Sequence, residues 1–198
     1  VIPVFNGAET IPVLIEQLSL LDVPKGKQIV LVVDGSPDNS LRICNDFCKN
    51  SAVPITVIDL ARNFGEHNAI MAGLAYTEGE FVITMDDDLQ NPAKEVLRLW
   101  EYTRDNNYDV VYAQYHTKMH AQWRNIGSKF TNWCVEKIQG KPKGLYLSSF
   151  RCMSRLVVDA IRSYTGPFPY IDGLVLQTTM HIGALEVEHL PRYKGKSN

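Results

Sequence analysis

The sequence lacks the common motifs that hold phosphate groups or metals through glycines and cysteines. Neither GxGxxG nor GxxxxGK[ST] occurs in its 198 residues, which excludes the usual dinucleotide cradle and the P-loop. The four cysteines form no CxxC pair and show no Cys/His metal spacing, so we expect reduced thiols rather than disulfides or a zinc site. Any phosphate-bearing ligand must therefore be held in another way.

Long apolar runs are also missing. No stretch approaches the ~18 apolar residues of a spanning helix, and no signal peptide opens the chain. The sequence starts directly on strand-like VIPVF and stops at KGKSN. We therefore expect a segment of a longer protein, which leaves open a C-terminal membrane segment beyond residue 198.

The composition is that of an ordinary globular chain, but its charge is unevenly distributed. Hydrophobic residues make up 45% and charged residues 21%, which is typical of folded domains. Residues 1–100 carry 14 acidic and 7 basic side chains, whereas residues 101–198 carry 8 acidic and 13 basic ones. The net charge of -2 argues against a nucleic-acid partner, and the contrast between the halves indicates two different tasks.

Strand-like and helix-like segments alternate along the first half of the chain. The predicted strands are Val1–Phe5, Gln28–Val33, Ile55–Leu60, Glu80–Met85 and Asp109–Gln114. Between most of them, apolar residues recur every three or four positions, as on the buried face of a helix; a further helix is predicted over Ala93–Arg104. This alternation predicts an α/β fold with a parallel sheet that is covered by helices on both faces.

Polar turns follow four of the predicted strands. In chain order they are Asn6-Gly7, Asp34-Gly35-Ser36, Arg62-Asn63-Phe64-Gly65 and Asp86-Asp87-Asp88. The carboxyl ends of parallel strands meet along one edge of a sheet, where ligands bind. We therefore expect these turns to form one site.

The acidic triplet Asp86, Asp87 and Asp88 needs a compensating charge. Unit charges ~4 Å apart repel by ~4 kcal/mol near a protein surface. A hard divalent cation, Mg²⁺ or Mn²⁺, would offset this repulsion and bridge the carboxylates to a diphosphate. Because side chains alternate along a strand end, we predict Asp86 and Asp88 as metal ligands and Asp87 as a supporting residue. A solvated loop with aspartate helix caps is the alternative.

The sequence resembles glycosyltransferase family 2. The resemblance is carried by VIPVFN, VVDGSPDNS and RNFGEHNAIMAGLAYTEGEFVITMDDDLQNP, and it extends over essentially the whole chain. Within the family the chain looks like the polyprenyl-phosphate glycosyltransferases, which include dolichol-phosphate mannose synthases and undecaprenyl-phosphate sugar transferases. The resemblance implies a GT-A fold, a Rossmann-like and mostly parallel sheet that binds a nucleotide sugar and a metal. It also implies one catalytic domain, with a nucleotide-sugar-binding half (1–115) and an acceptor-side half (116–198).

The resemblance assigns the donor site by position. The residues that it implies for the nucleotide sugar are Pro3, Asn6, Asp34, Asp86, Asp87, Arg192 and Ser197. Pro3 and Asn6 would border the base, and Asp34 would contact it. The family often has a second aspartate before Asp34 and a glutamate after Asn6, and this chain has Val33 and Gly7 there. Base contacts would then depend on one carboxylate.

The resemblance also implies the groups around the reacting phosphates. Asp88 would contact the metal and the diphosphate, and Gln90 would lie close to the sugar or the acceptor phosphate. In the terminal PRYKGKSN, the basic residues with Ser197 would close over the donor diphosphate and stabilise the departing charge.

Residues 116–143 form a basic segment that carries aromatic residues. They hold six Lys/Arg and one Glu, and Trp123, Phe130 and Trp133 recur at helical spacing. Such a basic amphipathic helix suits a membrane surface with anionic head groups, although packing of its stripe onto the domain is an equal alternative. The resemblance makes this the acceptor side, where Arg124 and Ser128 would receive a lipid phosphate.

The catalytic base is the least determined residue. Many relatives carry an aspartate just before the segment that aligns with FRCMSR, where this chain has Ser148-Ser149. Asp172 in PFPYIDGLVLQTT opens an apolar helix after a proline-aromatic loop, and we take it as the candidate base. A helix N-cap is the alternative, and a phosphate nucleophile can also react without a base.

The leading hypothesis is an inverting, metal-dependent transfer of a sugar from a nucleotide diphosphate, by default UDP, to a polyprenyl phosphate at the cytoplasmic face of a membrane. Transfer to a saccharide acceptor, a phospho-accepting signalling domain and a non-catalytic nucleotide-binding module are the alternatives. A homo-oligomer is left open.

Overall fold

The structure is a computed structural model that describes residues 1–115 and 145–191. Its elements in chain order are β1 (Ile2–Val4), α1 (Ile11–Ser19), β2 (Ile29–Asp34), α2 (Ser40–Asn50), β3 (Ile55–Leu60), α3 (Glu66–Leu74), β4 (Phe81–Thr84), α4 (Ala93–Asp105), β5 (Val110–Tyr115), β6 (Arg151–Ser154), α6 (Arg155–Arg162), α7 (Ile171–Thr178) and β7 (Ile182–Val187). The five predicted strands agree with the structure to within one residue at each end.

The strands form two hydrogen-bonded groups that meet at β1 and β4. The first group has the order β1-β2-β3 and is parallel, and the second has the order β4-β6-β5-β7. The Val1 ammonium donates to the Ile83 carbonyl at 2.7 Å, and the Met85 N–H donates to the Val1 carbonyl at 3.3 Å. These two bonds place the carboxyl end of β4 beside Val1, so the acidic triplet that follows β4 continues alongside β1 toward Gly7.

Strand β6 departs from the parallel pattern that the sequence predicts. It runs antiparallel to both β4 and β5 and lies between them, whereas β5 and β7 are parallel. Its sequence is only four residues long and directly precedes a helix, so periodicity alone does not reveal it. The insertion of β6 brings its first residue, Arg151, into the interior of the fold.

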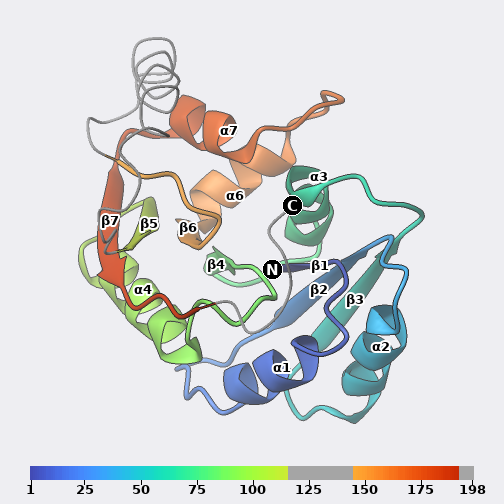
Figure 1. Ribbon diagram of the computed structural model, residues 1–198. Coiled ribbons are helices and arrows are strands. Elements are labelled where there is room, and N and C mark those ends of the chain that lie inside the picture. The colour runs from blue at the N-terminus through green and yellow to red at the C-terminus, as the bar shows by residue number, and fades with distance from the viewer. Residues whose placement is uncertain (116–144, 192–198) are drawn as a thin grey trace, which may run out of the picture.

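Helices cover both faces of the strands (Figure 1). Leu31 and Val33 of β2 pack in the core with residues of α1, α2 and α4, while Val30 and Val32 pack with α3. A second core joins α3, α6 and α7 to β4, β5 and β6. Because successive strand side chains point to opposite faces, an uninterrupted apolar strand such as β2 needs a helical layer on each side.

Two further features concern the periphery of the fold. An apolar cavity of about 510 Å³ lies at the amino ends of β2 and β4, with Leu18, Leu21 and Trp100 in its lining, and so on the edge opposite the acidic triplet. Across residues 1–115 and 145–191, no helix has the length and apolarity needed to cross a membrane.

Candidate active site

The β1–α1 loop is held in place by the turn that follows β2. The Asn6 N–H donates to the Ser36 hydroxyl at 2.8 Å, and the Gly7 N–H donates to the Ser40 hydroxyl at 3.0 Å. Both hydroxyls in turn donate to Asp38. Burial alone would raise the pKa of Asp38, but these hydrogen bonds outweigh it and lower the pKa to about 2. The Asp38 carboxylate therefore stays charged and fixes the loop in which Asn6, predicted to border a base, adopts a positive φ of 57°.

Asp34 connects the end of β2 to the loop between β3 and α3. Its two carboxylate oxygens accept hydrogen bonds from the backbone N–H groups of Phe64 (2.7 Å) and Gly65 (2.9 Å), and the residue is 4% exposed. Next to it, Gly35 has φ +60°, and a Cβ there would lie 2.3 Å from the Arg62 backbone. Asp34 thus shapes the loop from the inside, and its contact with a base stays a prediction.

The acidic triplet after β4 divides between two environments. Asp86 accepts a hydrogen bond from the Ser149 hydroxyl at 2.7 Å, and Asp88 accepts one from the Gln90 N–H at 3.1 Å. Asp87 instead approaches Gly7 of the β1–α1 loop. Burial, followed by the charges of Asp86 and Asp88, raises the pKa of Asp87 to about 7. The repulsion within the triplet is therefore partly relieved at Asp87, which is ionised less readily than an ordinary aspartate.

Gly7 leaves the space that Asp87 fills. A Cβ at position 7 would lie 2.2 Å from the Asp87 Oδ2 atom, far inside van der Waals contact. In the part of the chain that the structure describes, this buried oxygen has no hydrogen-bond partner. The glycine that departs from the resembled family's pattern is thus matched to the second aspartate of the triplet.

We expect Gly7→Ala to lower the free energy of unfolding by about 1–3 kcal/mol, because an added methyl group in a packed site forces its neighbours to move. Urea denaturation measures this change. The same substitution in an Asp87→Ala background should cost clearly less, since the clashing oxygen is then absent. Equal costs in both backgrounds would contradict the proposed match between the two positions.

Gln90 joins the triplet loop to the end of the described chain. Its side-chain amide donates to the Leu190 carbonyl at 3.2 Å and lies 3.2 Å from the His189 Nε2 atom, and the Leu190 N–H donates to the Gln90 carbonyl at 2.8 Å. The preceding Leu89 has a positive φ of 61°, which is uncommon for a non-glycine residue. This strained turn directs Gln90 toward the segment that leads into Arg192.

Asp172 lies in a buried ion pair with Arg151. The Arg151 guanidinium pairs with the Asp172 Oδ1 atom, which also accepts a hydrogen bond from the Tyr112 hydroxyl at 2.9 Å. The Arg151 Nε atom donates to the Thr84 hydroxyl at 3.2 Å, and Arg151 is only 1% exposed. The network therefore links β4, β5 and β6 to the first turn of α7. The role of Asp172 as a base stays a prediction.

Glu66 and His67, at the start of α3, belong to the same region although the sequence analysis does not identify them. Burial raises the pKa of Glu66, and the charges of Asp86 and Asp172 add to the rise while Arg151 opposes it. The His67 ring meets the Tyr170 ring edge-on, with 5.4 Å between their centroids. The signal was their position directly after the turn of β3, on the edge where the other turns gather.

The four predicted turns thus do meet at one edge. Contacts join the first turn to the second, the second to the third, and the fourth to the first. Arg124, Ser128, Arg192 and Ser197 lie outside the described residues, as does the basic segment 116–143. Among residues 1–115 and 145–191, no group of three or more His, Cys, Asp or Glu side chains is placed to hold a metal.

The model of the family described as "Glycosyl transferase family 2" matches residues 1–157. The chain belongs to this family. Its curated relatives include two undecaprenyl-phosphate 4-deoxy-4-formamido-L-arabinose transferases. That of Proteus mirabilis (strain HI4320) is 34% identical over 100% of this chain and 61% of that protein. That of Klebsiella pneumoniae (strain 342) is 35% identical over 81% of this chain and 50% of that protein. The family 2 chain therefore spans about half to three fifths of the length of these relatives.

Solved structures show that the family 2 chain has the GT-A fold. S. aureus TarS 1-349 in complex with UDP is 18% identical over 96% of this chain and 58% of that chain, with a TM-score of 0.67. M. tuberculosis glucosyl-3-phosphoglycerate synthase in complex with Mn²⁺, UDP-glucose and phosphoglyceric acid is 18% identical over 98% of this chain and 71% of that chain, with a TM-score of 0.66. The predicted fold class is confirmed.

Proposed function

We propose that this chain is the catalytic part of a glycosyltransferase that moves a sugar from a nucleotide diphosphate, UDP by preference, to a polyprenyl phosphate with inversion. The names of the undecaprenyl-phosphate transferases to which it is similar over its whole length support the acceptor class. The observation that carries the proposal is the acidic end of β4. There Asp87 approaches Gly7 of the β1–α1 loop, Asp86 accepts a hydrogen bond from Ser149, and the charge of Asp86 acts on Glu66.

Asp86 and Asp88 are the residues that would hold Mg²⁺ or Mn²⁺. A magnesium ion is commonly bound by one or two carboxylates together with substrate phosphates, so these two carboxylates suit an ion whose coordination a diphosphate completes. When bound, the ion supplies positive charge to the departing diphosphate. Ser149 and the Gln90 N–H orient the two carboxylates toward that task.

The acceptor would enter on the side of α3 and α7. A phosphate oxygen is already a nucleophile, so the chain must mainly orient it and exclude water. Asp172 is our candidate base, although its Oδ1 atom is engaged by Arg151 and Tyr112. We assign the receipt of the acceptor phosphate to Arg124 and Ser128, and the closure over the donor to Arg192 and Ser197.

A transfer assay tests this function and its metal dependence. The chain is incubated at neutral pH with Mn²⁺, undecaprenyl phosphate and each member of a panel of UDP-, GDP- and dTDP-sugars. The sugar-labelled lipid that forms is then measured. We expect transfer from one donor, loss of at least about 100-fold on metal removal with EDTA, and recovery with excess Mn²⁺ or Mg²⁺. Full activity in EDTA would contradict the metal role, and transfer only to an oligosaccharide would favour a saccharide acceptor.

A further inference from the structure

The connection between α6 and α7 presents an aromatic side chain to solvent. Residues 163–170 read SYTGPFPY, and they contain no charged side chain. Phe168 lies between two prolines and is 84% exposed. Figure 1 shows this connection extending outward beside α7. A partner that covered this ring would be stabilised by the burial of its apolar surface.

The loop is folded before any partner arrives. The Tyr164 hydroxyl donates to the Phe168 carbonyl at 3.3 Å. The same ring lies across Gly166, where a Cβ would be 2.2 Å from the Tyr164 hydroxyl oxygen. Tyr164 thus closes the loop on itself, and the prolines at 167 and 169 restrict its backbone further. Phe168 is therefore held outward rather than left to collapse onto the surface.

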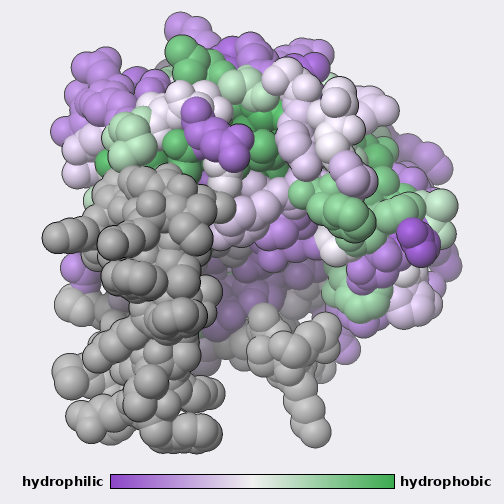
Figure 2. Space-filling model, turned by 90° about the horizontal axis from the view of Figure 1, so that it is seen from above, coloured by the Kyte–Doolittle hydropathy of each residue, from purple (hydrophilic) through white to green (hydrophobic). Residues whose placement is uncertain are grey.

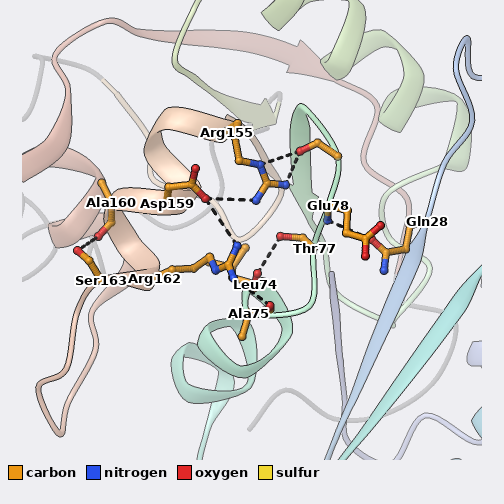
Figure 3. Close-up of polar contacts among 11 residues, drawn as sticks. Gln28, Leu74, Ala75, Thr77, Glu78, Arg155, Asp159, Ala160, Arg162 and Ser163 are labelled. Atoms are coloured by element: carbon orange, nitrogen blue, oxygen red, sulfur yellow. Dashed lines mark hydrogen bonds and ion pairs between the residues drawn. The ribbon is translucent and has the colours of Figure 1, made fainter.

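The α6 side of the loop is fixed to the body of the fold, as Figure 3 shows. Arg162, the last residue of α6, donates to the Ala75 carbonyl at 3.2 Å and pairs with Asp159 at 3.6 Å. Arg155 donates to the Gly79 carbonyl and also pairs with Asp159, at 3.5 Å. Two cations therefore share one carboxylate, which leaves this part of α6 with an excess of positive charge.

The α7 side of the loop reaches the candidate active site. Tyr170 is in edge-on contact with His67, and two residues further on Asp172 pairs with Arg151. The short path from Phe168 to Tyr170 means that whatever binds the loop tip lies at the mouth of the acceptor side.

We propose that residues 163–170 form a membrane-docking loop, which inserts the Phe168 ring into the boundary between head groups and acyl chains of a bilayer. The inference rests on the proposed function, because a lipid phosphate would reach the site from such a surface. Aromatic rings are favoured at this boundary, and tyrosine can keep its hydroxyl among the head groups. An uncharged loop enters without desolvating an ion, and the excess positive charge on α6 suits anionic lipids. The face seen from above in Figure 2 shows hydrophobic side chains exposed beside hydrophilic ones.

Vesicle binding of the whole chain tests the docking loop. Co-sedimentation with vesicles of phosphatidylcholine and phosphatidylglycerol, without any polyprenyl phosphate, compares the original chain with Phe168→Ser, Phe168→Trp and Leu20→Ser. Leu20 is the matched control, because it is 85% exposed and follows α1 on the opposite side of the strands. We expect Phe168→Ser to weaken binding about tenfold, while Phe168→Trp and Leu20→Ser keep it within about twofold.

Each other result overturns either the docking loop or the proposed function. Equal binding of Phe168→Ser and the original chain, or no vesicle binding by the original chain, would show that the loop does not enter a bilayer. A loss of self-association in Phe168→Ser, seen by sedimentation equilibrium, without a loss of vesicle binding would assign the loop to a second copy of the chain. Vesicle binding is measured without any acceptor, so it does not depend on sugar transfer. If the chain binds vesicles through Phe168 but transfers no sugar in the separate transfer assay, the proposed function alone is refuted. Transfer to detergent-dissolved undecaprenyl phosphate with Phe168-independent vesicle binding would refute the docking loop alone.

Discussion

Asp88→Ala is expected to lower the rate of sugar transfer by about 10²–10³-fold, the usual loss when one preorganised electrostatic group is removed from a reacting centre. Asp88 lies at the end of β4, and its carboxylate is oriented by the Gln90 N–H. If it holds a divalent ion against the donor diphosphate, its loss weakens both the ion and the charge stabilisation of the leaving group. Steady-state transfer rates and Mn²⁺ affinity, the latter measured by calorimetry with UDP present, report the two effects separately.

The control for this experiment is Asp105→Ala. Asp105 is the last residue of α4, is ion-paired with the exposed Arg104 at 2.7 Å and belongs to none of the turns at the site. Its replacement should leave transfer and Mn²⁺ affinity within about twofold of the original values, as expected for a surface substitution. If Asp88→Ala behaves like Asp105→Ala in both measurements, Asp88 has no role in metal binding.

Arg151→Met is expected to lower the free energy of unfolding by about 3–5 kcal/mol, because it leaves the Asp172 carboxylate buried without its cation. Arg151 is 1% exposed and Asp172 is 8% exposed, so water cannot readily replace the lost partner. The Tyr112 hydroxyl remains as a donor, but a single neutral donor compensates a buried charge poorly. Urea denaturation followed by circular dichroism gives the change.

Two further variants separate pairing from packing. In Arg151→Met/Asp172→Leu neither charge remains, so stability should recover part of the loss. Lys25→Met removes one partner of the exposed Lys25–Glu80 pair, and should change the stability by less than about 1 kcal/mol. The expected energetic role of the buried pair would be contradicted by either of two results. One is a double variant that is no more stable than Arg151→Met, and the other is an Arg151→Met variant that loses no more free energy of unfolding than Lys25→Met.

One further variant, Asp172→Asn, tests the candidate base. Asp172→Asn keeps the shape of the side chain but removes its charge and its basicity. If Asp172 is the base, kcat of the original enzyme should fall as the pH drops below its optimum. The variant should have a lower kcat that does not show this fall. A purely structural residue would instead change the stability and leave the pH profile of the remaining activity unaltered.

The sequence by itself determined the parallel β1–β3 strands, the order of helices around them and the edge at which the polar turns gather. Uninterrupted apolar strands and periodic helix faces are local features, and the rule that parallel strands share a carboxyl edge then brings Asn6, Asp34 and Asp86 together without further information. The motif residues also sufficed to recognise the family.

Only the tertiary structure decided what these residues touch. Asp34 accepts from the loop after β3, Asp87 turns toward Gly7, and Arg151 on the unexpected antiparallel strand β6 reaches Asp172 on α7. Glu66 joins Asp86 in one environment although 20 positions separate them. Contacts of this kind depend on how distant segments pack, and neither periodicity nor local spacing encodes the direction in which a buried charged side chain finds its partner.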